Sequence, residues 1–305
     1  MEAGKIVYHK DFLQRINKNA LNAYFLYIIR YIQKLLEFSR CNFVKQILIE
    51  LDFPEGLVDF PFKKKKEPRL LWHIAYDLLP VCDVLTEMGS AIAASFGHTV
   101  SCRKGCGVCC CQMVPLSPPE AAIIADVVDH LPPARKKTVL TNFAKALDKL
   151  DAAGLKETIS NIYSTRTDKK EVLDINRKYF ELGIPCPFLA EGSCSIHPHR
   201  PSRCREYSVL SSADFCKNPF DNRIKRLPLT IKLCESLSHA WSSLTGKPPI
   251  IIPLVKSLEW VQRNGDIRTL SVFGAEHVAR AVLEFACEKA NKIGQDRMKG
   301  EHHSI

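Results

Sequence analysis

The sequence lacks the short motifs that mark several large enzyme classes. It contains no Walker loop, no glycine-rich dinucleotide fingerprint and no HExxH zinc signature. It also lacks any alternation of strand and helix patterns and any repeat of fixed period, so a parallel α/β fold or a solenoid is not expected. The function must therefore be sought in other residues.

An export signal and a membrane span are also missing from the sequence. The first residues do not combine a basic region, an apolar region and a small-residue cleavage site, so we expect a cytoplasmic protein. The most apolar stretch, Ala20–Phe38, is shorter than the ~20 uncharged residues of a span and is interrupted by polar and charged residues. It is interpreted as an amphipathic helix.

Cysteine is abundant, and its distribution is uneven. With 305 residues, 46% of them hydrophobic, the chain can bury a core without disulfides, and cytoplasmic thiols stay reduced. Nine of the 13 cysteines lie between Cys102 and Cys216. The other four stand among apolar residues and are expected in the core: Cys41, Cys82, Cys234 and Cys287.

Helical periodicity dominates the rest of the chain. The spacing predicts helices over Leu71–Leu78 and Val81–Phe96, separated at Pro80, and Ser117–Glu120 forms a capping box that opens a helix to about His130. Further helices are expected over Val139–Leu150 (ending at Gly154), from Asp168 to Gly183, Ile231–Leu244 (ending at Gly246), Leu254–Val261 (ending at Gly265) and Val272–Ala290 (ending at Gly294). The expected fold is mainly α: a multi-helix domain with two irregular cysteine-rich metal-binding segments.

The expected division of the chain follows composition. Residues 1–60 form an N-terminal helical segment, 61–68 a basic linker, 69–225 the cysteine-bearing domain, and 226–305 a C-terminal helical segment that packs on it. The net charge of +10 raises the question of nucleic acid binding. The obvious local excess, Lys63–Lys66, stands in a Pro-containing stretch that favours a solvated tether.

The nine cysteines form two segments. The first segment is Cys102-x3-Cys106-x2-Cys109-Cys110-Cys111, in which Gly105 and Gly107 allow the backbone to turn so that thiolates converge. The second segment carries Cys186, Cys194, Cys204 and Cys216, with His197 and His199 between them. Four thiolates suffice for one zinc, whereas eight could serve two zinc sites or an iron–sulfur centre. Ligation by either histidine stays an alternative.

These two segments resemble the YkgJ-like cysteine-cluster family, a zinc- or iron-chelating domain named for its CxxCxxCC motif. The matching residues are the first cysteine segment with Leu116-Ser-Pro-Pro-Glu120, then Cys186-Pro-Phe-Leu189, Gly192-Ser-Cys-Ser-Ile-His197 and Arg200-Pro-Ser-Arg-Cys-Arg205. By position, the resemblance implies eight metal ligands: Cys102, Cys106, Cys109, Cys110, Cys186, Cys194, Cys204 and Cys216. The chain departs from the family in having three residues after Cys102 and in adding Cys111.

The resemblance also bears on activity. Because the family includes flagellin lysine N-methylases, it permits an S-adenosylmethionine-dependent methyltransferase acting on a protein substrate, or an iron–sulfur oxidoreductase. Arg200 and Arg205 are the candidate cofactor-binding residues, since cations stabilise neighbouring thiolates and could hold the carboxylate of S-adenosylmethionine.

Two other interpretations compete with this one. The spacing Cys102-x3-Cys106-x2-Cys109 resembles radical S-adenosylmethionine enzymes, but the following helices do not supply their βα units. The other is a non-enzymatic adaptor, in which structural zinc stabilises a basic surface that binds nucleic acid or a partner protein.

Overall fold

The computed structural model describes residues 46–53, 56–63, 68–161, 168–220, 223–272 and 274–298. The expected helix at Ala20–Phe38 and the expected core residue Cys41 lie outside these ranges. Within them the chain is mainly helical, which confirms the expected class.

The helices are α3 (Leu71–Leu78), α4 (Pro80–Ser95), α5 (Pro118–Asp129), α6 (Pro133–Ala152), α7 (Lys156–Asn161), α8 (Lys169–Glu181), α9 (Ser202–Glu206), α10 (Leu233–Thr245), α11 (Ser257–Arg263) and α12 (Ala275–Met298). Short 3-10 turns are η1 (Val108–Cys111), η2 (His197–His199), η3 (Ala213–Lys217), η4 (Leu254–Lys256) and η5 (Gly265–Arg268). The expected break before Pro80 and the helix ends at Gly183 and Gly246 are confirmed, and both glycines have positive φ.

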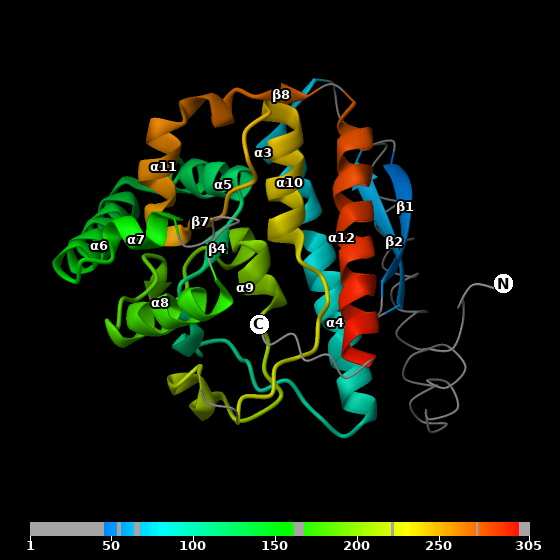
Figure 1. The fold of residues 1–305 in the computed structure, drawn as a ribbon, viewed down its shortest axis with the longest axis horizontal. Coiled ribbons are helices and arrows are strands. Elements are labelled where there is room, and N and C mark those ends of the chain that lie inside the picture. The colour runs from blue at the N-terminus through cyan, green and yellow to red at the C-terminus, as the bar shows by residue number, and fades with distance from the viewer. Residues whose placement is uncertain are drawn as a thin grey trace.

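The strands form two-stranded antiparallel sheets. These pair β1 (Gln46–Phe53) with β2 (Gly56–Lys63), β3 (Arg69–Leu70) with β8 (Ser271–Val272), β4 (Pro115–Leu116) with β7 (Ile252–Pro253), and β5 (Leu189–Ala190) with β6 (Ser193–Cys194). The pairs β3–β8 and β4–β7 are short and join segments that are distant in the chain, whereas β5 and β6 form a second, short hairpin. The helices labelled α4, α10 and α12 lie beside one another next to β1 and β2, and α6 lies at the opposite side of the molecule (Figure 1).

The β1–β2 hairpin corrects the expected N-terminal boundaries. Alternate residues of both strands, among them Ile49, Phe60 and Phe62, are buried, and α12 packs against β1. Residues 46–60 are therefore not helical where the structure describes them, and the first three residues of the expected linker, Pro61–Lys63, belong to β2. Residues 64–67 of that linker lie outside the described ranges.

Several helix limits also differ from expectation. Val272 pairs in β8 before α12 begins at Ala275, and Leu254 lies in η4 before α11 begins at Ser257. Helix α6 begins at Pro133 rather than near Val139, because a proline at the first helical position has no N–H to leave unpaired. Helix α12 continues through Gly294 to Met298, since one interior glycine costs only about 1 kcal/mol and no proline follows it.

One hydrophobic core joins residues from Ile49 in β1 to Ala290 in α12, and α3, α4, α5 and α10 contribute to it. The helical stretch Leu71–Ser95 is long and apolar enough to cross a membrane by length and composition. Its residues Leu71, Ile74 and Leu85 are fully buried in this core, which accounts for that composition.

Candidate metal centre

The first cysteine segment is a loop followed by a single 3-10 turn. The loop starts where Ser101 N donates to Val209 O (2.9 Å), and it turns at Gly105, which has a φ of +87°. Cys109, Cys110 and Cys111 then lie in η1. Because a 3-10 helix has three residues per turn, these three thiols leave the backbone in different directions.

The two cysteine segments meet at a contact between glycines. A Cβ on Gly107 would lie 2.6 Å from Leu189 Cδ1 and 2.9 Å from the carbonyl oxygen of Gly192. Gly192 and Glu191 both have positive φ and form the two-residue turn between β5 and β6. Gly107 is therefore required because two backbone segments approach each other closely at this position. The expectation that it provides a special turn geometry was wrong.

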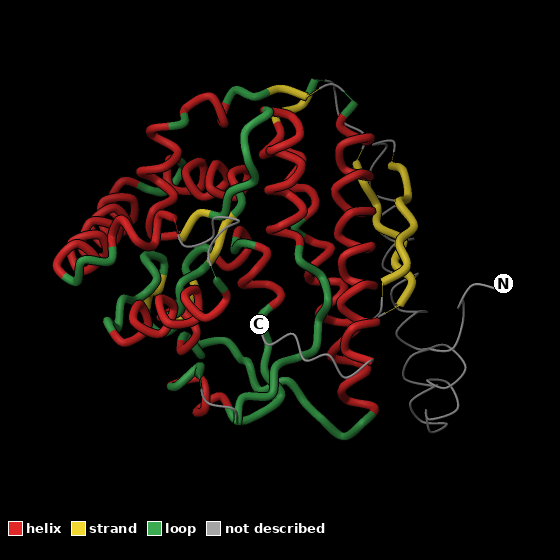
Figure 2. The backbone as a smooth tube through the Cα atoms, viewed as in Figure 1, coloured by secondary structure: helices red, strands yellow, loops and turns green. Residues whose placement is uncertain are grey.

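The second segment surrounds η1 with its four cysteines. Cys186 N donates to Cys110 O at 2.6 Å, and Cys194 lies in β6 opposite Leu189. Cys204 lies in α9, and the buried Cys216 lies in η3, which packs against η1. These contacts gather the nine cysteines in one region of the fold. We refer to it as the cysteine region. Figure 2 shows that much of the chain is loop on the side of the molecule away from the β1–β2 hairpin.

Cys109 is the electrostatic centre of the cysteine region. A hydrogen bond with Cys110 and burial raise its pKa. Burial is the main cause that raises the pKa of six further thiols, and in each the charge of Cys109 contributes: Cys102, Cys111, Cys186 (to about 12), Cys194, Cys204 and Cys216. Cys102 and Cys106 also raise the pKa of Cys216, whereas Cys186 and Cys194 raise the pKa of Cys204. The thiols therefore interact as two groups, and Cys109 interacts with both.

No group of three or more cysteine, histidine or acidic side chains has the geometry of a metal site in the part of the chain that the structure describes. His199 contacts Tyr76 instead, with its Nδ1 2.9 Å from the tyrosine hydroxyl. His197 is exposed, and the charge of Arg200 lowers its pKa. The thiols therefore lie in one region, but no three of them surround a common point with the geometry of a metal site in the described chain.

The two candidate arginines have different surroundings. Arg200 lowers the pKa of Cys102, Cys109, Cys194 and Cys204, and its buried Nε has no hydrogen-bond partner. Arg205 instead donates to the carbonyls of Arg200 (2.8 Å) and Pro198 (2.6 Å) and pairs with Asp83 of α4. Arg200 faces the thiols, whereas Arg205 holds the loop that carries them.

A buried carboxylate links the two family-like motifs. Glu120 completes the expected capping box, its Oε2 accepting hydrogen bonds from Ser117 N (2.9 Å) and Oγ (2.8 Å). Its Oε1 accepts from Ser202 N (2.9 Å) and Oγ (2.7 Å) at the start of α9. Glu120 therefore fixes the helix that carries Cys204, a role the sequence analysis did not find.

Glu206 holds the other end of α9. Its carboxylate accepts from Arg203 (3.1 Å), from the backbone of Leu233 (3.3 Å) and from the thiol of Cys82 (3.6 Å). No short sequence motif marks Glu206 or Asp83, because both act through contacts with residues distant in the chain. Cys82 and Cys234 are buried as expected, and Cys287 is half-buried with its thiol on Asp52 O.

No protein-family model matches the chain, and neither the curated proteins nor the solved structures compared with it give a match. The resemblance to the YkgJ-like family therefore rests on the motif residues alone.

Proposed function

We propose that the protein binds a metal, as an iron–sulfur centre or as zinc, through the thiolates of the cysteine region. The observation that carries this proposal is that both cysteine segments meet at η1, where Cys186 N donates to Cys110 O, η3 packs against η1 and Gly107 approaches Gly192. Buried thiols without a metal role are usually dispersed along the chain, as Cys82 and Cys234 are. Thiolates are the donors that zinc and iron–sulfur clusters prefer.

The residues that would hold the metal are the eight implied by the resemblance. Besides burial, Cys102, Cys106 and Cys109 raise the pKa of Cys216, and Cys186, Cys194 and Cys109 raise that of Cys204, so the thiols form two groups that share Cys109. Metal binding would replace the repulsion among these thiolates by attraction to a shared cation. Because the thiols have no common centre in the described chain, binding must include rotation of their side chains. Cys110 and Cys111 compete for the remaining position.

Arg200 fits an anionic centre. Its partly buried guanidinium is paired with Asp83 only at 3.5 Å, and its Nε is free to donate to a sulfur ligand. Hydrogen bonds to cluster sulfurs are one way in which a protein tunes such a centre. The resemblance extends the proposal to S-adenosylmethionine-dependent protein methylation or redox chemistry. Since Arg205 is fully engaged, Arg200 is the better candidate for the cofactor carboxylate.

Anaerobic purification, metal and sulfide analysis, and visible absorption test the proposal. Iron with sulfide and visible absorption would establish the cluster, and stoichiometric zinc in a colourless protein would establish the zinc form. Cys106→Ser, Cys194→Ser and Cys204→Ser should each lower the metal content, whereas Cys82→Ser and the half-buried control Cys287→Ser should not. Folded protein without metal, or equal losses in all five variants, would refute it.

A further inference from the structure

A groove lies beside the cysteine region, on the other side of the loop that follows Cys194. It is bounded by residues 68–77 of β3 and α3, by α5, by Arg135 of α6 and by residues 195–199, and its volume is about 890 Å³. Sites for small molecules commonly have volumes of roughly 300–1,000 Å³. The groove is therefore large enough for a ligand of one or more rings.

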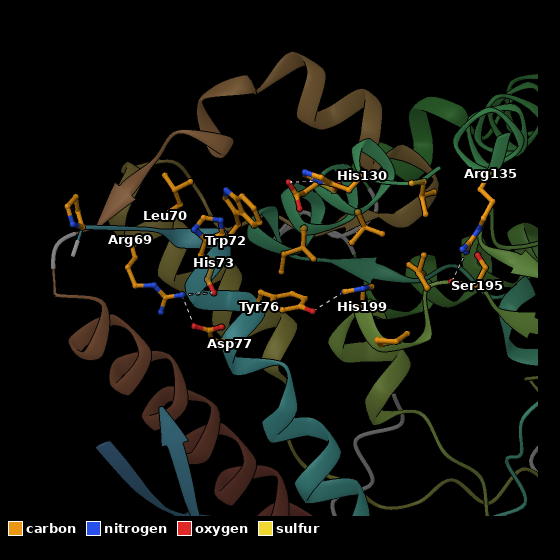
Figure 3. Close-up of a pocket in the computed structure, with 17 residues that line it drawn as sticks. Arg69, Leu70, Trp72, His73, Tyr76, Asp77, His130, Arg135, Ser195 and His199 are labelled. Atoms are coloured by element: carbon orange, nitrogen blue, oxygen red, sulfur yellow. Dashed lines mark hydrogen bonds and ion pairs between the residues drawn. The ribbon is translucent and has the colours of Figure 1, made fainter. Parts of the chain in front are cut away.

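The walls of this groove are aromatic and aliphatic. The rings of Tyr76 and His199 are stacked, with centroids 5.8 Å apart and planes at 26°, and a hydrogen bond joins them (Figure 3). Ile123 and Val127, one turn apart in α5, and Leu131, two residues beyond the end of that helix, add an aliphatic strip. Tyr76 stays 37% exposed although it is a large aromatic side chain. Such walls favour a flat, apolar ring.

Arg135 gives the groove an unbalanced positive charge. The other lining arginine, Arg69, is paired with Asp77 at 2.6 Å, and Asp126 is paired with Arg268 (3.7 Å) and His130 (3.4 Å). Arg135 has no carboxylate partner among the described residues, and its Nη2 donates only to Ser195 O (3.0 Å). Figure 3 places it at the end of the groove opposite Arg69 and Asp77.

We propose that this groove binds a small ligand that joins a planar aromatic ring to an anionic group. The ring lies against the Tyr76 and His199 wall, and the anion is held by the guanidinium of Arg135, which has donors left after its bond to Ser195. This site is independent of the proposed metal, although residues 195–199 place its occupant next to the cysteine region.

Isothermal titration with naphthalene-2-carboxylate and the neutral, nearly isosteric naphthalene-2-carboxamide tests this assignment. We expect the carboxylate to bind about tenfold more tightly, equivalent to about 1.4 kcal/mol. Arg135→Gln should remove this preference and Arg135→Lys should keep most of it. Lys137→Gln, which removes the same charge from an exposed position of α6 outside the groove, should leave it unchanged.

Tyr76→Ala provides the test of the ring contact and should weaken both naphthalene ligands about equally. Circular dichroism of each variant separates loss of the site from loss of the fold. Equal affinities for the two ligands, a preference that survives Arg135→Gln, or no binding of either ligand at millimolar concentration would overturn the proposal.

Discussion

Replacing Glu120 by alanine tests how the helix that carries Cys204 is held in place. The carboxylate is 1% exposed and accepts four hydrogen bonds, two of them from the backbone N–H groups of Ser117 and Ser202. Each of these two buried N–H groups costs about 1–3 kcal/mol when it is left without a partner. We therefore expect Glu120→Ala to lower the free energy of unfolding by roughly 2–6 kcal/mol.

Urea unfolding followed by circular dichroism measures this loss. The unfolding free energy of Glu120→Gln should lie between those of the native protein and Glu120→Ala. The amide keeps one acceptor oxygen but turns an NH2 group toward the remaining donors. The matched control is Glu171→Gln, which changes an exposed glutamate at the same third position of α8 and should cost less than about 0.5 kcal/mol. If Glu120→Ala changes the unfolding free energy by less than 1 kcal/mol and leaves the thiol reactivity of Cys204 unchanged, the inferred role is wrong.

Two further predictions follow from contacts near and far from the cysteines. Gly107→Ala should separate the two cysteine segments and reduce the amount of bound metal, because the added Cβ would overlap Leu189 and the Gly192 carbonyl. Gly265→Ala, whose Cβ would meet open space, should leave the metal content unchanged. Metal analysis of both variants checks this. Lys256 Nζ lies 2.7 Å from the carboxylate of Glu259 and lowers the pKa of that carboxyl group. The ion pair therefore stabilises the fold at pH values above the usual carboxyl pKa, and this stabilisation is lost as the pH falls through the lowered pKa. Urea unfolding between roughly pH 6 and pH 3 should therefore show a smaller pH dependence for Lys256→Met than for the native protein, and equal slopes would contradict the pairing.

Local features of the fold could be predicted from the sequence. The capping box at Ser117 and the glycines that end α8 and α10 are defined by residues within one or two turns, and all are observed. The β1–β2 hairpin was missed although Ile49, Leu51 and Phe53 alternate with polar residues. The neighbouring lysine run and Pro54 favoured a linker at this place. The alternation was overlooked because a short alternating run is a weaker signal than helical periodicity.

The cysteines of the candidate site could be predicted from the sequence, but the contacts that bring them together could not. Clustering of cysteines along the chain predicted that the two segments meet. The contacts that bring them together are long-range: Ser202 is 82 positions from Glu120, and Arg205 is 122 positions from Asp83. Gly107 was assigned to a turn because sequence alone does not show which backbone, here that of Gly192, approaches it.

Removal of the proposed metal should loosen the cysteine region without unfolding the protein. The main core joins β1, α3, α4, α5, α10 and α12 through aliphatic and aromatic side chains, and of the nine clustered cysteines only Cys186 and Cys194 pack against its edge. Its stability therefore does not depend on metal–thiolate bonds, unlike that of small zinc domains. After chelation, amide hydrogen exchange should accelerate in residues 102–111 and 186–216 and stay slow in α4, α5 and α10. The Cys106→Ser variant, already depleted of metal, should change little on chelation, and loss of protection throughout the long helices would show that the core depends on the metal after all.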